Sequence, residues 1–151
     1  MKISSFSEIE AEFIERVHAM VWCSAATLDT KNRPRSRILH PVWEGATGWV
    51  TTRPRSLKAK HIAHNPHISL AYIADVFKPV YVDCTAEWEN DLSNKRRVWE
   101  WIRSLAPPLG FDPETIFESV ESDGFGLLKL TPWRIELYDI ANREDQRVWR
   151  R

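Results

Sequence analysis

The stretch that decides the fold runs from Arg33 to Pro66, RPRSRILHPVWEGATGWVTTRPRSLKAKHIAHNP. It contains seven basic side chains and a single acid, Glu44, although the 21 basic and 21 acidic side chains of the whole chain cancel. The basic residues are Arg33, Arg35, Arg37, Arg53, Arg55, Lys58 and Lys60. Such a local surplus of positive charge predicts a bound anion. The alternative is a set of solvated strand and helix charges.

Two strands and a helix are expected within this stretch. Residues 34–43 alternate and are rich in β-branched side chains, residues 44–48 form a glycine-bearing turn, and residues 49–52 are a second apolar strand. This pattern predicts a hairpin. Ser56 is a good N-cap for the helix that follows, and Asn65-Pro66 ends it because the residue before a proline avoids the helical region.

The start of this helix is the expected anion site. Backbone N–H groups are unpaired there, and together with the helix dipole they attract a phosphate. Ser56 adds a hydroxyl and Lys58 a charge. The hairpin is expected to place Arg37 across from Thr51 and Thr52, which adds a planar donor suited to phosphate oxygens. Five side chains are therefore predicted to converge on one anion.

The order of these residues resembles the cofactor-binding segment of the pyridoxamine 5'-phosphate oxidase-like, FMN-binding split β-barrel family. The matching motifs are Arg37-Ile38-Leu39, Thr51-Thr52, Ser56-Leu57-Lys58 and Asn65 to Leu70. The resemblance implies an antiparallel split β-barrel with inserted helices. It also implies a homodimer with two cofactor sites at the subunit interface, each completed by residues of the other chain.

Carried over residue by residue, the resemblance implies two groups of contacts. The FMN phosphate is expected to contact Arg37, Thr52, Ser56 and Lys58. The isoalloxazine ring or the ribityl chain is expected to lie beside Ile38, Leu39 and Thr51. Trp133 and the strand Arg134 to Tyr138 are candidates for the contribution of the second subunit. The full set of expected cofactor-binding residues is Arg37, Ile38, Leu39, Thr51, Thr52, Ser56, Leu57, Lys58 and Trp133.

Departures from the family pattern concern the substrate. A lysine that holds the substrate's phosphate in the namesake enzyme is replaced by Pro41 or Val42. A glutamine that touches the flavin there falls on Pro79 or Val80. The family's substrate-binding segment has no counterpart in residues 93–103. The resemblance therefore favours the cofactor site over pyridoxamine phosphate oxidase activity.

The function implied is that of an FMN-dependent oxidoreductase acting on an unidentified small molecule. No catalytic residue is assigned, because a flavin ring itself accepts and donates electrons. One alternative is a deazaflavin-dependent reductase of the same fold, against which Arg37 favours FMN. Another is a barrel that binds flavin or haem without turnover, as a sensor, store or stress-related carrier.

The whole chain has the composition of one ordinary globular domain, residues 1–151, with 43% hydrophobic and 28% charged residues. It contains no run of about 18 apolar residues and no basic, then apolar, N-terminus. We therefore expect neither a membrane span nor a signal peptide. The expected location is the cytoplasm. The net charge of zero argues against a nucleic-acid partner, although basic residues interleave with Trp43 and Trp49.

Periodicity and turn residues place the remaining elements. Three helices are expected: one from a capping box of Ser7 with Glu10 to about Met20, one capped within Asn90 to Ser93 and running to Leu105, and one from Pro113 to about Val120. Five strands are expected, at Val21 to Leu28, Ile68 to Ile73, Val80 to Trp88, Phe125 to Leu130 and Trp133 to Ile140. A bend or bulge is expected at Thr131-Pro132. Composition favours a frayed tail for residues 141–151 over an arm that docks on a partner.

Cysteines and histidines give weaker signals. Cys23 and Cys84 lack CxxC spacing and are expected to be buried thiols. His61, His64 and His67 invite a metal interpretation, but a proline separates His67 from the helix and no further ligands complete a shell, so we expect surface histidines and no metal. His40 is expected on the face of its strand opposite Arg37, near a subunit contact or beside the flavin.

Overall fold

The structure is a computed structural model that describes residues 1–151. Its strands are β1 (Lys2–Ile3), β2 (Cys23–Leu28), β3 (Pro34–Leu39), β4 (Val42–Glu44), β5 (Thr47–Thr52), β6 (His67–Tyr72), β7 (Val80–Trp88), β8 (Gly126–Leu137) and β9 (Arg147–Arg150). Its α-helices are α1 (Glu10–Ala19), α2 (Leu57–His64), α3 (Leu92–Ser104) and α4 (Glu114–Phe117). The expected mainly β class with inserted helices is therefore confirmed.

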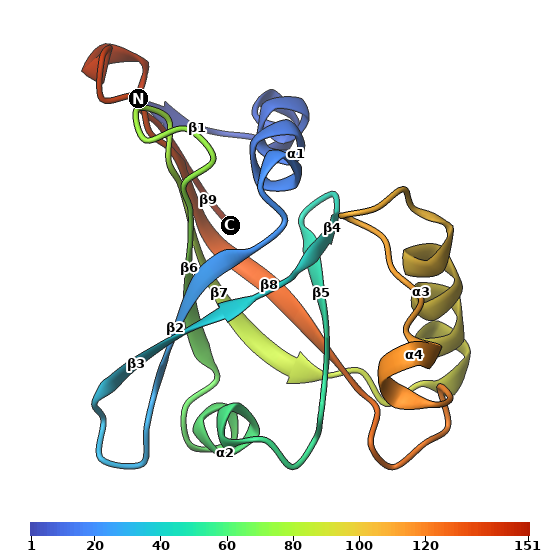
Figure 1. Cartoon of the computed structure of the whole chain (residues 1–151). Helices are drawn as coiled ribbons and strands as arrows, with labels where there is room; N and C mark the ends of the chain where they lie inside the picture. The colour runs from blue at the N-terminus through green and yellow to red at the C-terminus, as the bar shows by residue number, and fades with distance from the viewer.

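All nine strands belong to one sheet (Figure 1). The hydrogen-bonded order is β1-β9-β8-β7-β6-β2-β3, and β5 pairs with β8 and with β4. Every pair is antiparallel except β1 with β9. No pairing joins β3 to β5, so the sheet is not closed by hydrogen bonds, and β3 has β2 as its single neighbour.

The expected hairpin between residues 34–43 and 49–52 is wrong in its pairing. Strand β3 pairs with β2, which places Arg37 opposite Ala25 and not opposite Thr51 or Thr52. Only the three residues of β4 pair with β5. The physical reason is the His40-Pro41 step, because proline cannot donate to a ladder and interrupts the strand after Leu39.

Strand β8 links the two parts of the sheet. It pairs with β7 along its length, with β5 through residues 126–130 and with β9 through residues 134–137. The register shifts between Asp83, opposite Arg134, and Cys84, opposite Pro132, so Trp133 is the extra residue of a bulge. The expected irregularity at Pro132 is confirmed, but the two strands predicted there are one, because the ladder continues on both sides.

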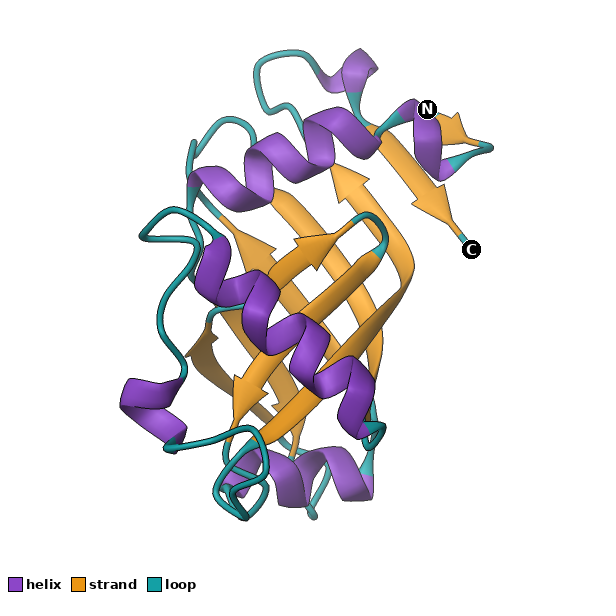
Figure 2. Cartoon of the chain, turned by 90° about the vertical axis from the view of Figure 1, so that its right-hand side faces the viewer, coloured by secondary structure: helices purple, strands orange, loops and turns teal.

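Helices cover the sheet in three places. Helices α1 and α2 lie at opposite ends of the curved sheet, whereas α3 and α4 lie along its outer face (Figures 1 and 2). Phe13 of α1 packs edge-on against Trp43 within the main core of 22 residues, with ring centroids 5.1 Å apart. A second core of eight residues joins α3 and α4 to the outer face of β4, β5 and β8.

The predicted helices differ from the observed ones at their ends. The first helix begins at Glu10, after a 3-10 turn at residues 6–8 in which Glu8 accepts a hydrogen bond from the Ser5 backbone, so the capping box predicted from Ser7 is wrong. Helix α3, in contrast, begins after the N-cap Asp91, which lies within the range Asn90 to Ser93 expected to supply the cap. Helix α4 ends early because Glu118 has a positive φ of 67°.

Residues 141–151 are not a frayed tail. Residues 143–145 form a 3-10 turn, and β9 pairs with both β8 and β1. Trp149 is buried and its ring lies 5.4 Å from that of Phe6. The prediction from polar composition failed because one large apolar side chain and a free strand edge on β8 are enough to dock the segment.

None of the helices is both long enough and apolar enough to cross a lipid bilayer.

Candidate functional site

The start of α2 is built as the sequence predicts. Strand β5 ends at Thr52, and the Ser56 side chain accepts a hydrogen bond from the Ala59 backbone at 3.2 Å, which caps the helix. The helix ends at Asn65, before Pro66. Because the Ser56 oxygen acts as the acceptor for the Ala59 N–H, its hydroxyl hydrogen remains able to donate to an anion.

Lys58 is directed inward from the first turn of α2. Its side chain is only 8% exposed, and its Nζ donates a hydrogen bond to Oγ1 of the buried Thr52. Thr52 lies opposite Gly126 on β8, and a Cβ at Gly126 would be 2.6 Å from the Trp88 ring. Glycine at this position therefore leaves room for the Trp88 ring to pack against the strand beside Thr52.

Arg37 reaches the same region from β3. One of its terminal nitrogens donates to Thr27 Oγ1 at 3.2 Å and to His61 Nδ1 at 3.0 Å. Its Nε is buried and has no hydrogen-bond partner. A guanidinium carries five N–H donors, so Arg37 retains an unused donor in a place from which water is excluded.

His61 belongs to this network and is not the surface residue that the sequence suggests. It is only 2% exposed, and Thr27 Oγ1 lies 2.9 Å from its Nδ1. Arginine can only donate, so His61 Nδ1 accepts and the proton of the neutral ring is on Nε2. Burial, followed by the charges of Arg37 and Arg35, lowers the pKa of His61. Its spacing of three residues from Lys58 on one helix was the signal for this position.

The electrostatics of the site are those of an uncompensated cation pair. Burial and then the Arg37 charge lower the pKa of Lys58, and burial and then Arg35 lower the pKa of Arg37. The nearby carboxylate, Asp29, forms its ion pairs with Arg33 and Arg35. No carboxylate pairs with Arg37 or Lys58. Two partly desolvated cations are therefore held together with nothing of opposite charge between them.

These residues fit a phosphate group. The unpartnered Arg37 Nε, the Lys58 ammonium, the Ser56 hydroxyl and the free N–H groups of the first α2 turn are all donors. A phosphate dianion would supply the acceptors and the charge that the site lacks. Arg37 reaches the site although the predicted pairing with β5 is wrong, because the edge strand β3 and the helix α2 both lie at this end of the sheet (Figure 1).

The remaining expected residues are not all brought to this point. Thr51 is half-buried, and the side chains of Ile38 and Leu57 are 66% and 56% exposed. The Leu39 side chain lies in the main core, so only its backbone is available to a ligand. Trp133 is 42% exposed on β8 and lines a separate cavity of about 290 Å³ beside β2 and β6.

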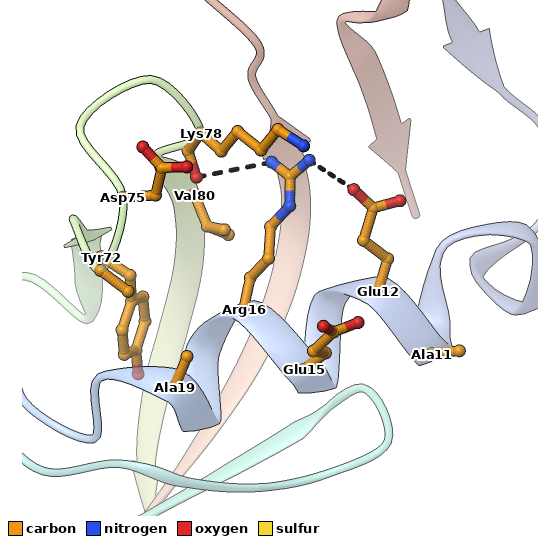
Figure 3. A pocket seen from close by; sticks show the side chains of 10 residues that line it. Ala11, Glu12, Glu15, Arg16, Ala19, Tyr72, Asp75, Lys78 and Val80 are labelled. Carbon is orange, nitrogen blue, oxygen red and sulfur yellow. Dashed lines mark hydrogen bonds and ion pairs between the residues drawn. The ribbon is translucent and has the colours of Figure 1, made fainter.

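A further cavity, of about 480 Å³, lies between α1 and the loop from β6 to β7 (Figure 3). Its central side chain, Arg16, donates to the Tyr138 carbonyl at 2.9 Å and pairs with Glu12. Arg16 also contacts the Lys78 carbonyl, and these contacts use its donors to fasten α1 to the sheet. The contacts of Arg16 therefore give its side chain a structural explanation.

Comparison with known proteins gives a consistent result for the fold. The sequence model described as pyridoxamine 5'-phosphate oxidase matches residues 9–139. No curated protein matches the chain.

Among solved structures, a Clostridium acetobutylicum protein related to general stress protein 26 is 14% identical with a TM-score of 0.73, and the match covers 95% of this chain and 94% of that one. A pyridoxamine 5'-phosphate oxidase-related, FMN-binding protein from Nostoc punctiforme is 16% identical with a TM-score of 0.66, covering 97% and 90%. HutZ, the heme storage protein from Vibrio cholerae, is 22% identical with a TM-score of 0.65, covering 82% and 89%. At these identities the matches show a shared fold.

Proposed function

Because the chain belongs to the pyridoxamine 5'-phosphate oxidase-like family, we propose that it binds FMN through Arg37 and Lys58. With this cofactor it acts as an oxidoreductase on a small molecule. A solved structure of similar fold is described as FMN-binding, which supports the choice of cofactor. The vitamin reaction itself is not proposed, because Pro41 and Val42 occupy the place of the family's substrate-phosphate lysine.

One observation carries this proposal. Arg37 of β3 and the buried Lys58 of α2 have no carboxylate partner, and the Nε of Arg37 is buried without any acceptor. A chain gains nothing in stability from two partly desolvated like charges, so their placement is best explained by a ligand of opposite charge. The phosphate of FMN provides that charge.

The chain's own residues would have distinct tasks. Arg37 and Lys58 neutralise the phosphate, and Ser56 with the first turn of α2 donates hydrogen bonds to it. Thr27 and His61 hold the Arg37 guanidinium in position. When bound, FMN supplies reversible transfer of electrons and hydride, and the protein supplies position and electrostatics.

We further propose a homodimer that completes the cofactor site. Trp22, just before β2, and Ile38 of β3 are exposed apolar side chains, and β3 is an edge strand with one free side. A second copy would cover these side chains and could bring Trp133 to the cofactor. A deazaflavin in place of FMN remains a second candidate, because it too has a phosphate-bearing side chain.

Purification followed by absorbance spectroscopy tests the function directly. We expect a yellow protein that releases FMN, identified by mass spectrometry, and whose bound flavin is bleached by NADPH or NADH and reoxidised by an added acceptor. A coloured protein that never turns over with any donor would support a carrier instead of an enzyme. Failure to bind both FMN and deazaflavin after reconstitution would remove the proposal.

A further inference from the structure

The turn between β2 and β3 is built around one buried carboxylate. Asp29 is only 5% exposed, and its Oδ1 accepts hydrogen bonds from the backbone N–H groups of Lys31 at 2.9 Å and Arg33 at 3.0 Å. Its Oδ2 accepts a further bond from Arg33 Nε at 2.9 Å. The Arg33 backbone bond is the main cause that lowers the pKa of Asp29, so the carboxylate is charged at neutral pH. Asp29 therefore fixes both the turn and the direction of the Arg33 side chain.

The same turn is fastened to the helix of the proposed phosphate site. Asn32 has a positive φ of 59°, which asparagine adopts more readily than most residues. Its side-chain oxygen lies 2.9 Å from Nε2 of His64, the last residue of α2. The β2–β3 turn and α2 accordingly lie at the same end of the sheet (Figure 1). The residues that follow the turn are therefore held in place beside α2.

Three arginines follow this turn at intervals of two residues. Arg33 precedes β3, and Arg35 and Arg37 lie on it. Residues at this spacing share one face of a strand and lie about 7 Å apart. Arg37 bonds Thr27 Oγ1 from that face, and Arg35 stands opposite Thr27 in the β2–β3 ladder. The row therefore runs along the free edge of β3, from the proposed phosphate site outward to the turn.

The outer arginines keep unused donors. The Arg33 side chain is 63% exposed and the Arg35 side chain is 50% exposed. Arg35 Nη1 lies 3.7 Å from Asp29 Oδ2, which is an ion pair but too long for a hydrogen bond. All the N–H donors of the Arg35 guanidinium are therefore free. A planar fork of free donors on a half-exposed side chain suits the oxygens of a phosphate.

Positive charge also remains for a second anion. Four cations lie in this region, and Asp29 is the one carboxylate that pairs with any of them. They are Arg33, Arg35, Arg37 and Lys58. A phosphate dianion held by Arg37 and Lys58 would leave a net positive charge at the outer half of the row, where Asp29 faces two arginines. An additional anion would neutralise this charge.

We propose that Arg33 and Arg35 form a second anion subsite, which binds a phosphoryl group additional to the one at Arg37 and Lys58. This inference rests on the proposed FMN function, because the first phosphoryl group is that of the flavin. Two nucleotides carry an additional group of this kind. In FAD it belongs to the cofactor itself and links the flavin part to adenosine. In a nicotinamide dinucleotide it belongs to a separate electron donor.

Two binding measurements by isothermal titration calorimetry distinguish these sources. The first compares FAD with FMN on the flavin-free chain, and a subsite for the cofactor should make FAD bind about tenfold more tightly. The second titrates the FMN-loaded chain with NADP⁺ and with nicotinamide riboside, which has the same ring but no phosphate. A subsite for the donor should make NADP⁺ bind about tenfold more tightly than the riboside, without a preference for FAD.

Arg35→Gln removes the charge and the fork with little effect on the fold, because Arg35 forms an ion pair but no hydrogen bond. It should abolish the tenfold advantage, and Arg33→Gln should act in the same direction. Arg96→Gln is the matched control and should preserve the advantage, because Arg96 of α3 is 56% exposed and pairs with one carboxylate. FMN and FAD have similar net charges, so a general loss of attraction cancels in their ratio. Circular dichroism confirms that each variant folds.

The outcomes separate this inference from the proposed function. Loss of either advantage in Arg35→Gln but not in Arg96→Gln supports the subsite and identifies its source. A chain that binds FMN but shows neither advantage, or that keeps it in Arg35→Gln, carries only solvated arginines on this edge. That result overturns the inference and leaves the proposed function intact. A chain that binds no flavin overturns the proposed function, and the inference falls with it.

Discussion

The Arg37 guanidinium disfavours the protonated form of Lys58. Burial of Lys58 and then this neighbouring cation lower the pKa of Lys58. The two groups come from β3 and α2, which share no backbone pairing. Holding them together costs free energy in the ligand-free chain, and a bound dianion would reverse the sign of that interaction. Affinity and stability should therefore respond to these residues in opposite directions.

FMN affinity is the first property that follows from this pair. Arg37→Ala and Lys58→Ala should each weaken FMN by about 1–3 kcal/mol, the range for a charge-assisted contact. The measurement is fluorescence titration of free flavin with the purified chain. Lys60→Ala is the matched control, because Lys60 is exposed on the same helix. Unchanged affinity in both site variants would remove the proposed phosphate site.

Stability without cofactor should move the other way at Lys58. Replacing this buried cation with an apolar side chain of similar length, in Lys58→Met, removes the repulsion with Arg37 and the desolvation of the ammonium. We expect the free energy of unfolding to rise by about 1 kcal/mol in urea titrations of the FMN-free chain. Lys60→Met should change it little. A destabilised Lys58→Met chain would mean that the hydrogen bond to Thr52 outweighs the repulsion.

Local signals in the sequence were enough for the parts of the site that lie on one element. Ser56 as N-cap and Asn65-Pro66 as the end of α2 are both confirmed, because capping and proline sterics act within a few residues. The strand Val80 to Trp88 is confirmed at both ends. Cys23 and Cys84 are free and buried as predicted.

Long-range pairing could not be read in the same way. The hairpin prediction treated Arg37 and Thr52 as neighbours across a turn, but the proline after His40 ends β3 and releases it to β2. His61 is buried through its contact with Thr27, which lies on a distant strand, so the residues around His61 in the sequence give no sign of this burial. Tertiary contacts of this kind leave no periodic signal in the sequence.

The docked C-terminal segment gives a stability prediction. Trp149 is buried against Phe6 and belongs to the main core, so Trp149→Ala should lower the free energy of unfolding by about 3 kcal/mol. Arg150→Ala, at an exposed neighbour on the same strand, should change it by less than about 0.5 kcal/mol. Chemical denaturation followed by tryptophan fluorescence or circular dichroism measures both. Equal, small effects would mean that β9 contributes little to the fold.

Self-association should depend on the outer face of β3. Ile38 is 66% exposed there, so Ile38→Glu should leave the monomer folded but place a charge in the proposed dimer interface. We expect the original chain to be a dimer in light scattering coupled to size-exclusion chromatography, and the variant to shift toward monomer. Ile73→Glu is the control, because Ile73 is also exposed but directly follows β6 and is not part of β3. A variant that remains fully dimeric would place the interface elsewhere.

The pH dependence of stability should report the neutral state of His61. Burial and the charges of Arg37 and Arg35 lower the pKa of His61 in the folded chain, so the unfolded chain binds more protons at mildly acidic pH. The stability that depends on the neutral ring is therefore complete above the unfolded value of about 6.5, and it is lost as the pH falls below that value toward the folded pKa. His18 and His40 also have lowered pKa values and add to this slope.

A difference between variants isolates the contribution of His61. His61→Gln keeps an acceptor for Arg37 and Thr27 but cannot be protonated, so its free energy of unfolding should fall less steeply between about pH 7 and pH 5 than that of the original chain. His67→Gln alters an exposed histidine beyond the same helix and should preserve the original slope. Urea titrations at several pH values provide the comparison. Parallel slopes for the original chain and His61→Gln would show that His61 is protonated equally in the folded and unfolded states, and would contradict its role as the neutral acceptor that positions Arg37.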